Sequence, residues 1–183
     1  MIYTKKGDEG ETIKFDGSSV SKDDLLIEVL GSLDETSSFL GLCIVKAEGF
    51  DIKISDISFS NILEKVQYNL FLIQSVVAGK EMQKLDLEIK GIESTIDWLE
   101  TKLLPLNKFL KTGGNELALL LNYERTLIRK AERRTVALFK KDSLKNKYSN
   151  KKKILAYLNR LSDLFFVLYR FVNINSGHKE EYF

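Results

Sequence analysis

Apolar residues recur at helical spacing in five separate stretches of the chain. In the first stretch Leu26, Val29, Leu33 and Leu40 repeat at near-helical intervals, and similar patterns cover residues 61–77, 84–104, 115–140 and 151–173. Spacings of i, i+3, i+4 and i+7 place apolar side chains on one face of an α-helix, and no stretch alternates as a strand would. With mostly short connections, the pattern predicts an all-α, up-and-down five-helix bundle.

Local signals set the expected boundaries of these helices. Ser21, with Asp24 three residues later, resembles a capping box and predicts a first helix over residues 21–46. Pro105 is expected to stop the third helix. The Gly-rich residues 1–21 are expected to form a loop, residues 22–175 the bundle and residues 176–183 a tail, within one domain spanning 1–183.

Composition and charge narrow the function classes. The 183 residues are 44% hydrophobic with one proline, which excludes a disordered or collagen-like chain. Lys and Arg number 28 against 26 Asp and Glu, so the net charge of +2 gives no broad attraction to nucleic acid or to a membrane. The Lys-rich connector 140–153 is expected to be a solvated, mobile loop. Nucleic-acid binding through it stays an alternative, although interleaved stacking aromatics are absent.

Cysteine and histidine are nearly missing, which removes several kinds of chemistry. Cys43 is the only cysteine and His178 the only histidine. One chain therefore cannot build a disulfide, a cysteine-based metal site, a Ser-His-Asp triad or an HExxH zinc site. The polar start lacks a signal-peptide core and no apolar run is long enough to span a membrane, so we expect a cytoplasmic protein.

Charged and polar residues in the two C-terminal helices are the candidates for a binding site. Arg125, Arg129, Glu132 and Arg133 fall at offsets 0, 4, 7 and 8 and share one helix face. This face is either a salt-bridged surface or the wall of an anion pocket. The fifth helix is apolar around its circumference, so the polar residues that interrupt it are expected to be buried and to need partners: Asn159, Arg160 and Asp163.

Asp34 raises the same question in the first helix. It lies within an apolar pattern, and an arginine of the fourth helix would satisfy its carboxylate, either as a simple packing contact or as part of a site. Inward-facing arginines, asparagine and acids beside a basic Gly-rich loop are typical of a pocket for a polyanion such as a nucleoside triphosphate. The loop is no P-loop, because GxxxxGK[ST] is absent.

Several sequence blocks, in order along nearly the whole chain, carry a resemblance to a known family. They are TKKGDEGET, SKDD, GSLDETSSFLG, FLKTGG, RKAERR and ILAYLNRLSDLFFVLYRFVN. Together they resemble the PduO-type ATP:cob(I)alamin adenosyltransferases. The resemblance implies a ferritin-like helical bundle assembled as a homotrimer, with active sites between subunits. It also implies transfer of the 5′-deoxyadenosyl group of ATP to the cobalt of cob(I)alamin, with Mg²⁺ on the triphosphate and a reductase and a B12-dependent enzyme as partners.

The resemblance also assigns site residues. Its ATP site maps to Thr4, Lys5, Lys6, Gly7, Thr12, Lys22, Arg129, Lys130, Glu132, Arg133 and Asn159. Arg129 is expected to stabilise the leaving triphosphate. A pairing of Asp34 with Arg125 is expected to order the corrinoid side, and Phe109 to displace the lower ligand of cobalt. From the residues alone, Phe109 is predicted to be a core side chain that anchors its loop.

The chain departs from the family pattern at four positions. Lys6, Ile13 and Thr112 stand where relatives commonly have threonine, a hydroxyl residue and proline, and Lys130 replaces an arginine. Lysine keeps the charge but loses the bidentate fork, so ATP affinity is the property in question. Besides nucleic-acid binding, two alternatives stay open at this point: a catalytically impaired relative that senses or carries ATP or corrinoid, and a purely structural helical bundle.

Overall fold

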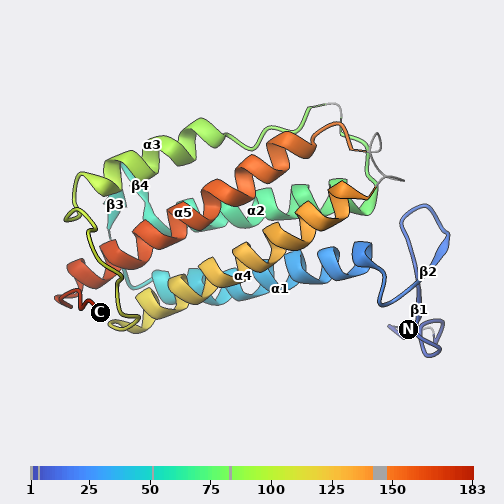
Figure 1. Ribbon diagram of the computed structural model, residues 1–183, viewed down its shortest axis with the longest axis horizontal. Helices are drawn as coiled ribbons and strands as arrows, with labels where there is room; N and C mark the ends of the chain where they lie inside the picture. Colours follow the sequence, from blue (N-terminus) through green and yellow to red (C-terminus); the bar gives the residue numbers. More distant parts are fainter. Residues whose placement is uncertain (1, 4, 51, 83, 142–147) are drawn as a thin grey trace.

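The computed structural model describes residues 2–3, 5–50, 52–82, 84–141 and 148–183 (Figure 1). Five helices account for most of these residues, and they match the five predicted stretches: α1 (Leu25–Ala47), α2 (Phe59–Ala78), α3 (Ile89–Glu100), α4 (Glu116–Lys140) and α5 (Lys151–Asn175). The all-α bundle is therefore confirmed.

Short polar side chains begin three of the helices. The side chains of Asp24, Ser58 and Asn115 accept hydrogen bonds from backbone N–H groups at the starts of α1, α2 and α4. The predicted capping role of Ser21 is wrong, because Asp24 caps α1 and Ser21 belongs to a strand. At its other end α2 stops at Gly79, whose φ of 113° suits glycine.

The third helix is shorter than predicted at both ends. Residues 84–87 are extended rather than helical, because Leu85 and Leu87 bury their side chains in the core in alternation with exposed residues, and Glu88 has a left-handed backbone with a φ of 45° just before the helix begins. The helix also ends at Glu100, five residues before Pro105, so the proline does not itself terminate it. The apolar pattern before the helix therefore reflects packed extended chain, and the pattern after it, at residues 101–103, reflects turns.

Two small hairpins were not predicted. β1 (Glu11–Ile13) pairs antiparallel with β2 (Ser19–Ser21), so the second half of the expected N-terminal loop is a hairpin, whereas residues 5–10 form turns. β3 (Lys53–Ile54) pairs antiparallel with β4 (Ile57–Ser58) between α1 and α2. Each strand has two or three residues, too few to produce a recognisable alternation.

The helices pack in a chain of neighbours, with α1 against α2 and α4, α4 against α5, and α3 against α5. The core between them includes the fully buried Tyr157, whose hydroxyl accepts a hydrogen bond from Asn69 of α2 at 3.0 Å. Figure 1 places the N-terminal hairpin beyond one end of the bundle and the C-terminus at the other. The N-terminal hairpin and the C-terminus therefore lie at opposite ends of the bundle.

The connector between α4 and α5 is only partly solvated. Residues 142–147 lie outside the described residues, but Tyr148 is 6% exposed and its hydroxyl donates to the carbonyl of Val77 at 3.2 Å. Lys153 donates to the carbonyl of Leu85 at 2.6 Å. The prediction of a solvated loop is therefore wrong for the second half of the connector, which packs against the segment after α2.

Among the described helices, none combines the length and the apolarity that crossing a membrane requires.

Candidate functional site

Helix α4 carries two adjacent rows of basic side chains, which differ in whether acidic residues of the same chain pair with them. In one row, Lys130 forms an ion pair with Glu35 of α1, and Arg134 forms an ion pair with Glu28. Arg134 also donates to the Ser32 hydroxyl at 3.1 Å. The charges of this row are thus neutralised by α1 within the chain, as a salt-bridged surface would be.

The second row, Arg125, Arg129 and Arg133, is not neutralised in this way. Arg129 and Arg133 are exposed, and neither side chain makes a hydrogen bond or ion pair with any other described residue. The half-buried Arg125 donates to Asn122 at 2.9 Å, and its guanidinium lies 5.9 Å from the centre of the Phe166 ring. Burial, and then the charge of Arg129, lower the pKa of Arg125. An anion bound along this row would relieve the repulsion.

Asn159 and its polar neighbours on α5 are exposed or half-buried, so the prediction that they are buried is wrong. Asn159 donates to Glu132 of α4 at 3.3 Å, next to the arginine row. Arg160 contacts Asp163 at 2.8 Å and Glu93 of α3 at 3.2 Å. These residues occupy a strip of α5 that its neighbours α3 and α4 leave uncovered, beside a groove of about 490 Å³ between α3 and α5.

Asp34 is exposed on α1, and the described part of the chain offers its carboxylate no hydrogen bond or ion pair. The expected contact with Arg125 is not made within one chain, since Arg125 bonds Asn122 instead. Asp34 was predicted to be buried because apolar residues surround it in the sequence, but in the helix this position faces away from the core. Both partners of the expected pair thus stand unneutralised.

The N-terminal hairpin gathers the loop residues of the predicted ATP site. Lys22 donates through Nζ to the carbonyl of Gly7 at 2.6 Å and through its backbone to Gly10 at 2.8 Å. Lys5 and Lys6 are exposed, Thr12 lies in β1, and Thr4 is outside the described residues. Within the described chain no hydrogen bond or ion pair joins this hairpin to the α4 arginine row. One chain therefore does not unite the two halves of the predicted site.

Phe109 is 86% exposed, so the prediction that it anchors its loop in the core is wrong. It lies in the connector of residues 101–115 between α3 and α4, which we call the Phe109 loop. The loop pairs with the C-terminal tail, residues 176–183, through a bridge between Leu110 and Tyr182. Backbone contacts, and not the aromatic ring, hold the loop, which leaves the ring free to meet a ligand.

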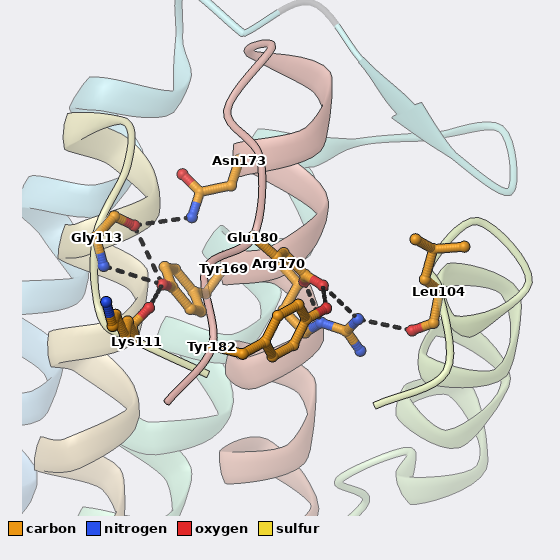
Figure 2. Close-up of polar contacts among 8 residues, drawn as sticks. All are labelled: Leu104, Lys111, Gly113, Tyr169, Arg170, Asn173, Glu180 and Tyr182. Atoms are coloured by element: carbon orange, nitrogen blue, oxygen red, sulfur yellow. Dashed lines mark hydrogen bonds and ion pairs between the residues drawn. The ribbon is translucent and has the colours of Figure 1, made fainter. Parts of the chain in front are cut away.

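Two residues of α5 hold the C-terminal end of the Phe109 loop, as Figure 2 shows. The Tyr169 hydroxyl accepts from the Gly113 N–H at 3.2 Å, and Asn173 bonds both the Gly113 carbonyl and the Asn115 N–H. Gly114 has a φ of 113°, and a Cβ there would lie 2.0 Å from the Asn173 side chain. Only glycine fits this turn.

Sequence reasoning also missed Glu124, the most deeply buried charged side chain of α4. Its exposure is 0%, and neither carboxylate oxygen has a hydrogen-bond partner among the described residues. Burial raises the pKa of Glu124 to about 9. Its position was readable, since it lies on the stripe of Leu121, Ile128 and Ala131, at helical spacing from each.

Within the described residues, no group of three or more His, Cys, Asp and Glu side chains is arranged to hold a metal ion. Cys43 is a buried free thiol, and burial, followed by the charge of Glu124, raises its pKa to about 12. A thiol of this kind is a poor nucleophile and a poor metal ligand.

Comparison with known proteins gives a consistent result. The family model described as cobalamin adenosyltransferase matches residues 2–172. A corrinoid adenosyltransferase of Bacillus subtilis is 36% identical over 180 residues, which cover 96% of this chain and 88% of that protein. Corrinoid adenosyltransferase PduO of Citrobacter freundii is 34% identical over 92% of this chain, which spans only 49% of that longer relative.

Solved structures of similar fold support the same relationship. A variant PduO-type ATP:corrinoid adenosyltransferase from Lactobacillus reuteri, complexed with cobalamin and ATP, superposes with a TM-score of 0.85 at 28% identity, covering 100% of this chain and 96% of that one. A second variant from the same organism, complexed with ATP, has a TM-score of 0.82 at 28% identity and covers 100% of this chain and 99% of its own.

Proposed function

The chain belongs to the cobalamin adenosyltransferase family, and we propose that its unneutralised arginine row binds and discharges the triphosphate of ATP. The activity is that of an ATP:corrinoid adenosyltransferase. One observation carries the residue assignment: α1 neutralises Lys130 and Arg134, whereas Arg129 and Arg133 are left without partners among the described residues. Anion binding explains why these two positive charges lie unpaired side by side in the described chain, and a purely structural role for the bundle does not explain it.

The reaction requires the protein mainly to position the two reactants and to stabilise negative charge on the leaving group. Co(I) attacks the ribose C5′, the Co–C bond forms, the C5′–O bond breaks and triphosphate leaves with the electron pair. No side-chain nucleophile takes part, in keeping with the inert thiol of Cys43. The chain would position the reactants, and the Arg129 guanidinium would stabilise charge on the departing triphosphate. Glu132 and Asn159, already hydrogen-bonded at 3.3 Å, are proposed to bind the nucleotide beside it.

The direct test is anaerobic incubation of the purified protein with ATP, Mg²⁺ and chemically reduced cobalamin. We expect the cob(I)alamin spectrum to give way to that of an alkylcobalamin, with one triphosphate released per product. If cobalamin stays unalkylated while ATP still raises the melting temperature, the protein is a nucleotide-binding sensor or carrier and the catalytic assignment is wrong.

We propose that each complete site forms between two copies of the chain, in a homotrimer. The N-terminal segment of residues 5–22, which holds Lys5, Lys6, Gly7, Thr12 and Lys22, lies beyond one end of the bundle, and the Phe109 loop lies near the other (Figure 1). A neighbouring copy could bring its hairpin to the arginine row, and an Asp34 to Arg125. Exposed apolar side chains on α1 and α2, among them Val45 and Phe71, offer surface for such packing.

A shared site predicts complementation between two defective chains. Lys22→Ala removes the hairpin's contribution and Arg129→Ala removes the row's, so each variant alone should be nearly inactive. In a random 1:1 mixture about one quarter of the sites would join an intact hairpin to an intact row, so we expect roughly a quarter of the wild-type activity. Co-expression with two tags isolates mixed trimers, each of which has one complete site in three, so this purified fraction should reach about a third of the wild-type activity. Mixed assemblies that remain inactive, or a monomeric wild type, would rule out the shared site.

Phe109 is proposed to act before the chemical step, by displacing the lower axial ligand of cobalt. The 86% exposure of Phe109 supports this role, since a ring so exposed contributes little to packing within the chain. Lower coordination of Co(II) favours its reduction to Co(I), by the axial-ligand effect common to metal cofactors.

Phe109→Ala should therefore lower turnover with cobalamin about tenfold to a hundredfold, as loss of positioning does elsewhere. ATP affinity should be unchanged, as should the melting temperature, because an exposed ring contributes little to folding. Isothermal titration with ATP and the steady-state assay separate the two effects. An equal loss of ATP affinity would contradict this role for Phe109.

The remaining partners follow from the same chemistry. Mg²⁺ is proposed to accompany the triphosphate, bound mainly through phosphate oxygens. A reductase must supply Co(I), and a B12-dependent enzyme would consume the product. We propose the cytoplasm as the site of action, where a reducing environment suits the free thiol of Cys43.

A further inference from the structure

Helix α5 ends in a buried ion pair that the proposed reaction does not use directly. Arg170 contacts Glu180 of the tail through two bonds, Nε to Oε1 at 2.5 Å and Nη2 to Oε2 at 3.0 Å. The two side chains are only 6% and 7% exposed. Burial would raise the pKa of Glu180, but hydrogen bonds from Arg170 and Tyr182 and the charge of Arg170 outweigh it and lower the pKa. The carboxylate thus stays charged, as a bidentate pair requires.

The same guanidinium reaches a third segment. Arg170 donates through Nη2 to the carbonyl of Leu104 at 2.7 Å, near the N-terminal end of the Phe109 loop. The Tyr182 hydroxyl donates at 2.6 Å to Oε2 of Glu180, the oxygen that also accepts from Arg170 Nη2. Figure 2 shows these groups converging between α5, the tail and the start of the loop. We call Arg170, Glu180 and Tyr182 the tail latch.

The latched tail in turn pairs with the backbone around Phe109. The Lys111 N–H donates to the Glu181 carbonyl at 2.8 Å, and the Phe183 N–H donates to the Phe109 carbonyl at 3.1 Å. The tail therefore pairs with the backbone of residue 109 itself. With Tyr169 and Asn173 fixing the far end at Gly113, the loop is held at both ends by α5 and in its middle by the tail.

The Phe109 ring cannot fix its own position, because it is 86% exposed. We propose that the tail latch is a positioning device for the corrinoid step: through the tail strand, Arg170 and Glu180 set the height and angle at which Phe109 meets the lower face of the corrinoid. This inference rests on the proposed role of Phe109. A displacement of about 1 Å in such a group can cost a hundredfold in rate, so a distant ion pair can matter to turnover.

The test compares Glu180→Gln with Glu181→Gln. The first keeps the shape of the buried carboxyl but removes its charge, and the second removes an exposed charge one residue away whose one ion pair among the described residues is with Lys111, at 3.7 Å. Tyr182→Phe removes one bond to Glu180 and provides a milder variant should Glu180→Gln fold poorly. Phe109→Ala is the reference, and melting temperatures with ATP confirm that each trimer is folded.

Two readouts distinguish positioning from general damage. The first is turnover with cobalamin against turnover with cobinamide, a corrinoid that lacks the lower base and so needs no displacement. The second is the electron paramagnetic resonance spectrum of cob(II)alamin on the ATP-bound protein, in which splitting by the lower nitrogen ligand reports whether that ligand is still bound.

We expect Glu180→Gln to slow turnover with cobalamin about tenfold and with cobinamide much less, to leave the KM for ATP unchanged, and to retain more of the nitrogen splitting than wild type. Tyr182→Phe should shift both readouts in the same direction by less, and Glu181→Gln should match wild type. Equal losses with the two corrinoids, or wild-type behaviour of Glu180→Gln and Tyr182→Phe while Phe109→Ala is impaired, would overturn the latch. A wild-type protein inactive on both corrinoids would instead refute the proposed function.

Discussion

Replacing Arg129 with lysine is expected to lower kcat by about two to three orders of magnitude, the usual cost of removing one preorganised donor from developing negative charge. Arg129 is exposed and unpaired within the described chain, so its guanidinium is available to the triphosphate. It also lies near enough to Arg125 to lower that residue's pKa, which marks a site of concentrated positive charge. Lysine preserves this charge but cannot form two parallel bonds with phosphate oxygens.

Arg134→Lys is the matched control for this experiment. Arg134 lies on the same helix, but its guanidinium is already occupied by Glu28 and Ser32 of α1. We expect Arg134→Lys to keep the wild-type kcat and to lose at most a little stability, as surface ion pairs contribute little. Similar losses of kcat in both variants would show that the helix tolerates no change on this side, and the assignment of Arg129 would fail.

The helical fold was predictable because a long amphipathic helix produces a regular repeat of apolar residues in the sequence. α4 and α5 were placed to within about two residues, consistent with stretches that hold no glycine or proline. The hairpins β1–β2 and β3–β4 were missed because strands of two or three residues have no measurable period. At residues 84–87 the two buried leucines of an extended segment resemble the start of a helix in the sequence. In both cases tertiary packing determines the secondary structure, which the local sequence pattern does not specify.

The site was predictable in residue type but not in arrangement. The arginine row could be read from offsets of four, yet nothing local separates it from the neighbouring row, which α1 neutralises through Glu35 and Glu28. The burial of Arg170 against Glu180 depends on the tail folding back on α5. Asn159 and Asp34 were expected inside, but the described chain leaves both exposed. Side-chain contacts between distant segments, and between copies, are not encoded in periodicity.

Glu124 gives the second large prediction, a stability that falls as pH rises. In the folded chain burial holds the pKa of Glu124 near 9, whereas in the unfolded chain it returns to about 4.3, its ordinary value. Between these values the folded state keeps a proton that the unfolded state has lost, so the free energy of unfolding declines with pH. The slope from this one group is about 1.4 kcal/mol per pH unit.

Glu124→Gln should remove that slope, because the amide has nearly the same shape and does not titrate. In urea unfolding at pH 6, 7 and 8, the free energy of unfolding of the variant should rise relative to that of wild type by about 1.4 kcal/mol with each pH unit. Glu116→Gln, an exposed position of the same helix paired with Lys46 at 3.0 Å, should leave the wild-type slope in place. Parallel pH profiles for Glu124→Gln and wild type would mean that the carboxyl is ionised in the folded chain. The interior would then have to supply Glu124 with a partner, which its two unbonded oxygens do not have among the described residues.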